Sequence, residues 1–147
     1  MKIAFDCRYV RTDHHDGISR FSARLVEQLA PLAAQRGDEL IMLISDEKQL
    51  GMLPELSYEL ISSPTSPREP FVASQINKLS PDIVFSPMQT IGARGRRYKL
   101  VLTVHDLIYY SHPTPPRQFS WPIRLMWRLY HTAWWPQKVL LAHSDAV

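Results

Sequence analysis

Two neighbouring side chains, His105 and Asp106, could act directly on a ligand. They follow the apolar run Leu100–Val104, which has the composition of a buried strand. An imidazole at a strand end can donate to a substrate hydroxyl or phosphate, and the adjacent carboxylate can bind sugar hydroxyls. We therefore take both as candidate catalytic residues. The alternative is a structural histidine or a polar strand end.

A second candidate site lies where a polar loop meets the first predicted helix. Gly17 allows a ligand to approach the backbone closely, and the amides of Ile18, Ser19 and Arg20 are expected to point outward from the helix N-terminus. Such an arrangement favours a phosphate or carboxylate. Asp16 or Ser19 could cap the helix. Asp16, Gly17, Ile18 and Arg20 are thus candidate residues for binding an anionic ligand, with a plain turn as the alternative.

Other familiar sites are absent from the sequence. Neither the dinucleotide fingerprint GxGxxG nor the phosphate loop GxxxxGK[ST] occurs. The single cysteine, Cys7, excludes a disulfide framework and a thiolate zinc site, and we expect it to be inert core. His14 and His15 are adjacent, which is the wrong spacing for two ligands on one helix face, so we expect exposed loop residues and no metal.

Strand-like and helix-like segments must position these residues. The expected strands cover 2–5 with a less regular continuation to 10, 39–45, 58–62, 82–87 and 100–107, and the expected helices cover 18–36, 71–79 and 117–142. Pro31 should kink or shorten the first helix, and Pro136 should kink the last. The alternation predicts an α/β fold, a Rossmann-like parallel sheet with helices on both faces. The length of 147 residues corresponds to one domain.

Charge is distributed unevenly along the chain. Residues 1–67 hold 7 Lys/Arg and 10 Asp/Glu, whereas residues 68–147 hold 10 and 4. Arg124 and Arg128 share one face of the last predicted helix, and Trp127 lies on an adjacent strip. These three are candidates for contact with an anionic membrane surface. The alternative is a helix whose aromatic side chains pack into the core while its arginines are solvated.

Partner and location follow from composition. No apolar run approaches the roughly 20 residues needed to span a bilayer, and the N-terminus lacks the organisation of a signal peptide. We expect a cytoplasmic protein that could bind peripherally at the inner face of the membrane. The basic turn over residues 92–99 lacks an ordered aromatic platform, which argues against nucleic acid.

The order of these segments resembles the N-terminal half of a family 4 glycosyltransferase, a retaining enzyme of the GT-B fold. The resemblance rests on KIAFDCRYV at the start, on the loop ending in GISRF, on DIVFSP and on LVLTVHDLI. The segment Ser144–Val147 is similar to the lead into that family's next strand. The resemblance implies a truncated chain, with 1–147 as the acceptor-side domain and the C-terminal donor-binding domain absent.

The resemblance also implies roles for individual residues. Gly17 would lie near the donor diphosphate, His105 would contact the donor sugar, and Asp106 would support His105 or the acceptor. The family usually has two adjacent glycines where Asp16-Gly17 stands here. A nucleotide-sugar donor is expected for the full-length enzyme, with a lipid-linked, polysaccharide or other acceptor, no cofactor in this fragment and no activity of the fragment alone. The alternative is a non-catalytic Rossmann-like module that docks on an anionic membrane surface or ligand.

Overall fold

A computed structural model describes residues 1–105, 120–132, 138 and 141–147 of the chain. Five parallel strands form one sheet in the order β3-β2-β1-β4-β5. Their bounds are β1 Lys2–Asp6, β2 Glu39–Ile44, β3 Tyr58–Leu60, β4 Ile83–Ser86 and β5 Lys99–Leu102. The α/β, Rossmann-like prediction is confirmed.

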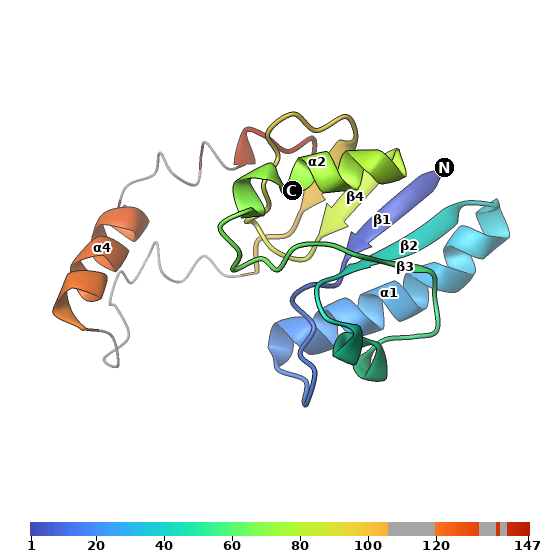
Figure 1. The fold of residues 1–147 in the computed structure, drawn as a ribbon, viewed down its shortest axis with the longest axis horizontal. Helices are drawn as coiled ribbons and strands as arrows, with labels where there is room; N and C mark the ends of the chain where they lie inside the picture. Colours follow the sequence, from blue (N-terminus) through green and yellow to red (C-terminus); the bar gives the residue numbers. More distant parts are fainter. Residues whose placement is uncertain (106–119, 133–137, 139–140) are drawn as a thin grey trace.

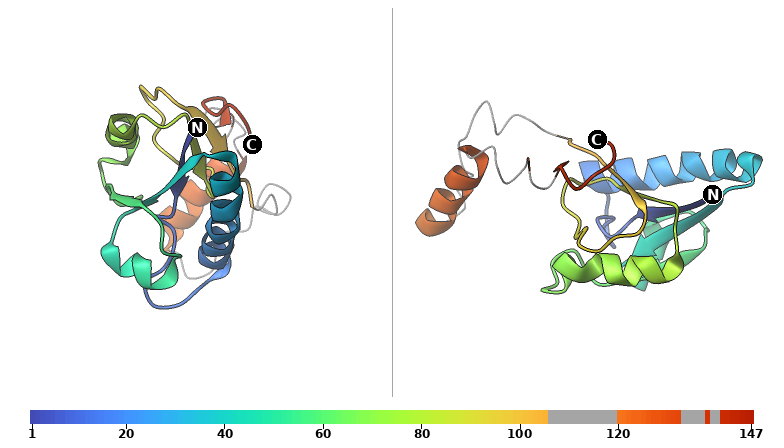
Figure 2. Two further views of the ribbon diagram at one scale, coloured as in Figure 1. Left: turned by 90° about the vertical axis from the view of Figure 1, so that its right-hand side faces the viewer. Right: turned by 90° about the horizontal axis from the view of Figure 1, so that it is seen from above.

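Helices cover both faces of this sheet (Figures 1 and 2). The long helix α1 lies on one face, and the short helix α2 lies on the other. The helical elements are α1 Gly17–Arg36, η1 Glu47–Met52, η2 Glu69–Phe71, α2 Val72–Ile76, η3 Asn77–Leu79 and α4 Trp121–Thr132.

The core is divided in two by the alternation of side chains along each strand. Phe5 and Met42 pack with Val26 of α1 on one face. Ala4 and Leu43, their neighbours in sequence, belong to the cluster on the α2 face. Because both faces are covered, the inner residues of the central strands are apolar on both sides of the sheet, as the sequence of 39–45 indicated.

Several boundaries differ from the sequence prediction. β1 ends at Asp6 because the chain then turns, with the amide of Val10 donating to the carbonyl of Cys7 at 2.9 Å. β3 and β5 are shorter than expected, and the segment 71–79 is divided into three short helical pieces that begin at Glu69.

Pro31 does not shorten α1, which continues to Arg36. A proline removes only one backbone hydrogen bond, and the helix end is held by Gly37 in the left-handed conformation. Of the long helix expected over 117–142, the structure describes α4 over Trp121–Thr132. Pro136 and the proposed kink lie outside the described residues.

A short segment near the end of the chain adds to the sheet beside β5. Ala146 forms a parallel bridge with Val101, and the amide of Asp145 donates to the carbonyl of Leu100 at 2.8 Å. This bridge extends the sheet by one residue pair beyond β5.

Candidate functional site

The carboxyl ends of the parallel strands bring polar residues to one edge of the sheet. β1 ends at Asp6 and the neighbouring β4 ends at Ser86, whose hydroxyl donates to the Asp6 carboxylate at 3.0 Å. Open α/β sheets bind their ligands beyond this edge. The candidate site is therefore built on the segments that follow these strands.

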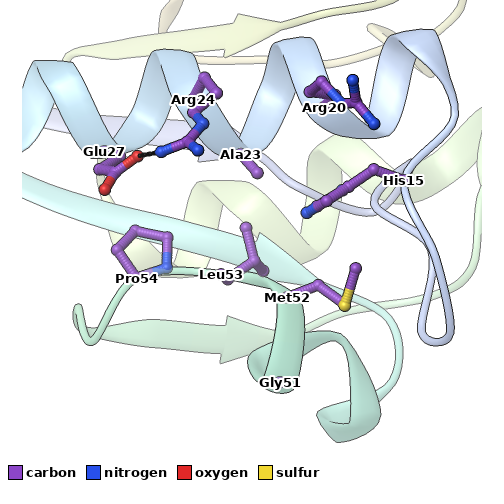
Figure 3. A pocket seen from close by; sticks show the side chains of 9 residues that line it. All are labelled: His15, Arg20, Ala23, Arg24, Glu27, Gly51, Met52, Leu53 and Pro54. Atoms are coloured by element: carbon purple, nitrogen blue, oxygen red, sulfur yellow. Dashed lines mark hydrogen bonds and ion pairs between the residues drawn. The ribbon is translucent and has the colours of Figure 1, made fainter.

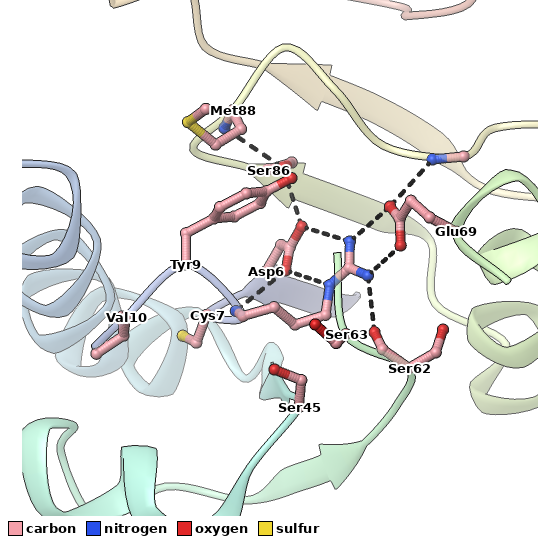
Figure 4. A network of polar contacts seen from close by, with 12 residues as sticks. Asp6, Cys7, Tyr9, Val10, Ser45, Ser62, Ser63, Glu69, Ser86 and Met88 are labelled. Atoms are coloured by element: carbon pink, nitrogen blue, oxygen red, sulfur yellow. Dashed lines mark hydrogen bonds and ion pairs between the residues drawn. The ribbon is translucent and has the colours of Figure 1, made fainter. Parts of the chain in front are cut away.

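A buried ion-pair network fills the inner part of this edge (Figure 4). The side chains of Asp6 and Arg8 are both fully buried. Nε and Nη2 of Arg8 donate to the two carboxylate oxygens of Asp6 at 2.8 and 3.0 Å. Nη1 and Nη2 donate to Glu69 at 2.6 and 3.1 Å, and Nη1 also donates to the carbonyl of Ser62 at 3.0 Å.

All five N–H groups of the Arg8 guanidinium are thus used inside the protein. Burial by itself lowers the pKa of Arg8, but the charges and hydrogen bonds of Asp6 and Glu69 outweigh it and raise the pKa above its ordinary value. A guanidinium without a remaining donor cannot bind a ligand unless it first breaks an internal bond. We conclude that Arg8 links Asp6 at the end of β1 to Ser62 and Glu69, and that it has no donor left for a ligand.

The backbone closes tightly around Glu69. A Cβ atom at Gly92 would overlap with the backbone carbonyl of Glu69, so only glycine allows this approach. The hydroxyl of Tyr98, whose side chain is buried, finds no hydrogen-bond partner among the described residues. Burial raises the pKa of Tyr98 to about 12.

Gln49 holds the turn after β1 from the other side. Its side-chain nitrogen donates to the carbonyls of Cys7 and Arg8 at 3.2 Å each, and its oxygen accepts from the amide of Ser45 at 2.8 Å. Burial raises the pKa of the Cys7 thiol, which supports its assignment as inert core. These contacts fix the start of the loop that leads to α1.

At the N-terminus of α1, part of the expected anion site is already occupied. The Asp16 carboxylate caps the helix by accepting from the amide of Ser19 at 2.9 Å, and the amide of Arg20 donates to the Asp16 carbonyl at 2.9 Å. The expectation that three amides point outward to a ligand is therefore wrong for Ser19 and Arg20. Ile18 is half-buried, whereas the Arg20 side chain is exposed.

Gly17 meets open space. A Cβ atom there would have no heavy atom within 4 Å, and its backbone does not require glycine. The two loop histidines differ from one another. His14 is exposed beside Asp13, whereas His15 is half-buried and its Nδ1 lies 2.8 Å from the hydroxyl of Ser19. The prediction of an exposed loop residue is thus wrong for His15.

His105 lies at this same edge, just beyond β5. Its Nε2 lies 2.6 Å from the carbonyl oxygen of Pro87, and because a carbonyl only accepts, Nε2 carries the hydrogen. The ring also meets Phe21 of α1 edge-on, with 4.8 Å between centroids. The structure therefore brings His105 together with the first turns of α1. Asp106 lies outside the described residues.

The sequence indicated the exposed residues at this edge of the sheet, but it did not indicate the buried polar network beneath them. The charged residues Asp6 and Arg8 stand directly after an apolar strand, and that position was a usable signal for a buried pair. Glu69 and Gln49 lie in unremarkable polar segments, and only the folded chain brings them to the site.

The basic helix α4 presents exposed apolar side chains. Trp121 is 75% and Met126 is 70% exposed, and Arg124 and Arg128 are exposed as well. The side chain of Trp127 lies outside the described residues. Within the described part of the chain, no helix has the length and apolar character required to cross a membrane.

No cluster of three or more potential metal ligands occurs among the residues that the structure describes. Comparison with known proteins adds no assignment to this geometry. The chain matches no protein-family model, no curated protein and no solved structure.

Proposed function

We propose that this chain is the acceptor-side domain of a retaining glycosyltransferase that transfers a sugar from a nucleotide-sugar donor. The observation that carries the proposal is the meeting of His105 with Phe21 at the carboxyl edge of a parallel sheet. Through this contact, the polar loop that ends at Gly17 and the end of β5 lie together at the carboxyl edge, where open α/β sheets bind their ligands. The order of these segments in the sequence supplies the similarity to family 4 enzymes.

His105 is suited to contact a sugar hydroxyl. Its Nε2 hydrogen is held by the carbonyl of Pro87, so the neutral ring keeps a lone pair on Nδ1 that can accept from a hydroxyl. Pro87 and Phe21 together fix the plane of the ring. Because the ring is already held in place, it loses little further conformational entropy when the sugar binds. The role of Asp106 rests on the sequence resemblance alone.

The loop before α1 is suited to lie against a diphosphate. The open space at Gly17 leaves room for phosphate oxygens to approach the backbone. Arg11 lies 3.7 Å from the carboxylate of Asp16, and this guanidinium partly offsets the negative charge there. Arg20, one turn into α1, adds a second positive charge. Stabilisation of charge on the leaving diphosphate is the main catalytic demand in this reaction class.

The test uses a protein in which this domain is joined to its donor-binding domain. Replacing His105 with alanine should lower kcat by roughly 100- to 1,000-fold, as expected for loss of one preorganised polar contact, with a smaller effect on the acceptor KM. His143→Ala is the matched control, because His143 is an exposed histidine of another segment, whose backbone carbonyl accepts from Arg96 just before β5. An unchanged kcat in His105→Ala would return His105 to a structural role.

The isolated chain provides a second test of the same proposal. Residues 1–147 should turn over no nucleotide sugar, because the proposed donor-binding groups belong to another domain. Turnover by the purified chain would contradict that division of labour.

A second candidate function, docking on an anionic membrane surface, is favoured by α4. Exposed Trp121 and Met126 lie on the same helix as Arg124 and Arg128, and Figure 1 draws α4 away from the sheet. Aromatic side chains favour the headgroup region, and each arginine near an anionic surface contributes about 1 kcal/mol. This function could accompany glycosyl transfer or replace it in a non-catalytic module.

Vesicle co-sedimentation tests the membrane role. The chain should bind phosphatidylserine vesicles and not phosphatidylcholine vesicles, and Arg124→Glu/Arg128→Glu should weaken binding at least roughly 30-fold. The matched control is Arg94→Glu/Arg97→Glu, which changes the same charge on exposed residues of another segment. Equal binding to both lipids, or equal losses in both double variants, would reject the proposal.

A further inference from the structure

An open groove of about 540 Å³ lies between α1 and the end of η1 with the two residues that follow it (Figure 3). One wall is formed by about two turns of α1, from Arg20 to Glu27, and the opposite wall is formed by residues 51–54. The groove is separate from the contact between His105 and Phe21. Its lining residues are His15, Arg20, Ala23, Arg24, Glu27, Gly51, Met52, Leu53 and Pro54.

The helical wall carries positive charge. Arg20 and Arg24 are four residues apart and therefore lie one above the other on the same face of α1. Nη1 of Arg24 is 2.8 Å from the Glu27 carboxylate. Among the residues that the structure describes, the Arg20 side chain has neither a hydrogen-bond nor an ion-pair partner. One guanidinium is therefore available at once, and the second is shared with a single carboxylate.

His15 adds a polar group at the end of the groove. The contact between its Nδ1 and the Ser19 hydroxyl, at 2.8 Å, holds the ring in place. Figure 3 shows the imidazole pointing from the loop into the space between α1 and Met52. The ring therefore lines the same groove as the Arg20 side chain.

The opposite wall is mainly apolar. Met52, Leu53 and Pro54 face the helix, and Ala23 lies between the two arginines on the helical side. Apolar walls with a few convergent polar groups are typical of small-molecule sites. A free inorganic anion would leave this apolar surface uncovered.

We propose that the groove binds a small phosphate monoester whose phosphate is attached to an apolar or ring-shaped body. The phosphate contacts Arg20, with Arg24 and His15 as further donors, and the attached body packs against Met52 and Leu53. A phosphate dianion suits two guanidinium groups one turn apart better than a single carboxylate does. This binding function goes beyond glycosyl transfer. It shares Arg20 with the proposed diphosphate contact, but phenyl phosphate binding is measured without any transferase activity.

Phenyl phosphate is the probe, titrated into the isotope-labelled chain and followed by NMR. Saturable shifts are expected at the backbone amides of Arg20, Ala23 and Leu53. Inorganic phosphate, which lacks the ring, and phenol, which lacks the charge, should each bind more weakly. Equal affinity for phenyl phosphate and either fragment would overturn the proposal.

Three variants assign the binding to the groove. Arg20→Gln should weaken phenyl phosphate binding by about tenfold, the loss of one charge-assisted contact. Glu27→Gln should strengthen it, because Arg24 is released and a repelling charge is removed. Arg94→Gln removes the same charge from an exposed loop outside the groove and should change nothing.

The variants also define failure. Equal losses in Arg20→Gln and Arg94→Gln would show general attraction to a basic protein, and unchanged or weaker binding in Glu27→Gln would contradict the assigned role of Arg24. All three side chains are exposed, so the fold should persist, and thermal unfolding of each variant checks this.

Discussion

The inner and outer parts of the carboxyl edge use charge in opposite ways. Inside, the guanidinium of Arg8 is fully buried and all of its donors bind Asp6, Glu69 or Ser62. Outside, Arg20 is exposed beside a groove and has no side-chain partner in the described part of the chain. Both arginines follow the same strand, twelve residues apart.

This difference separates residues that hold the fold from residues that are available to a ligand. A buried charge must be matched by opposite charge and hydrogen bonds, because its desolvation is costly. An exposed charge has no such requirement and contributes little to stability. The number of internal partners of a charged side chain therefore indicates its role better than its position at the sheet edge.

The largest effect is expected when the inner network loses its cation. Arg8→Met leaves the carboxylates of Asp6 and Glu69 facing one another without compensation, and it should lower the free energy of unfolding by about 3–5 kcal/mol. Arg8→Lys should recover part of the loss, because it restores the positive charge. The recovery should be incomplete, because an ammonium cannot form both bidentate contacts. Urea unfolding gives these values.

Arg24→Gln is the control for this comparison. Its ion pair with Glu27 is at the surface, so the loss should not exceed about 0.5 kcal/mol. Similar losses in Arg8→Met and Arg24→Gln would show that burial of the network contributes nothing.

Two glycines repeat the contrast between the inner and outer regions. Gly92→Ala forces a Cβ against the backbone of Glu69 and should cost about 3 kcal/mol, the upper end for overpacking. Gly17→Ala faces open space and should leave stability within about 0.5 kcal/mol of the native value. Thermal or urea unfolding of the two variants measures both losses of stability. Equal effects of the two substitutions would contradict the assigned difference.

Buried Tyr98 should make the free energy of unfolding depend on pH. Burial raises its pKa to about 12, above the ordinary value near 10. Between these values the unfolded chain loses the proton while the folded chain keeps it, so stability should fall as pH rises from about 10 to 12, by roughly 2–3 kcal/mol. Below pH 10 this contribution is fully present.

Tyr98→Phe isolates that contribution. The variant should lack this part of the alkaline decline, and at neutral pH it should be at least as stable as the native chain, because the hydroxyl it removes has no partner among the described residues. Urea unfolding across this pH range measures the difference. An identical pH dependence in both proteins would show that Tyr98 ionises normally.

The smallest expected effect concerns the cap of α1. Asp16→Ala removes the acceptor for the amide of Ser19 and should cost about 1 kcal/mol, whereas Asp16→Asn should retain most of the cap. Asp13→Ala removes a carboxylate from the same loop but no cap, and it should cost less. Thermal unfolding compares the stability of the three variants. Equal losses of stability in Asp13→Ala and Asp16→Ala would contradict a capping role for Asp16.

The sequence predicted most of the fold because its signals are local. Apolar runs indicated the five strands, Asp16 was one of two predicted caps for α1, and Gly37 was expected just past its end. Pro31 was expected to kink or shorten α1, but the helix is not shortened and continues to Arg36, because packing and caps at both ends outweigh one lost hydrogen bond. Strand ends were also less well predicted, since they depend on the register with neighbouring strands.

The candidate site was only partly readable. Gly17, Arg20 and His105 were found from their places before a helix or after a strand, and those places follow from the sequence alone. The contact of His105 with Phe21, 84 residues away, could not be read from either residue.

By itself, the sequence determined the alternation of strands and helices, because side-chain periodicity and caps act over a few residues. Only the tertiary structure decided which charges are buried and which remain available. Arg8 meets Glu69 across 61 residues, and Gly92 lies against the same glutamate across 23. Such pairs depend on how the strands and loops are placed in space, and that placement is a property of the whole folded chain.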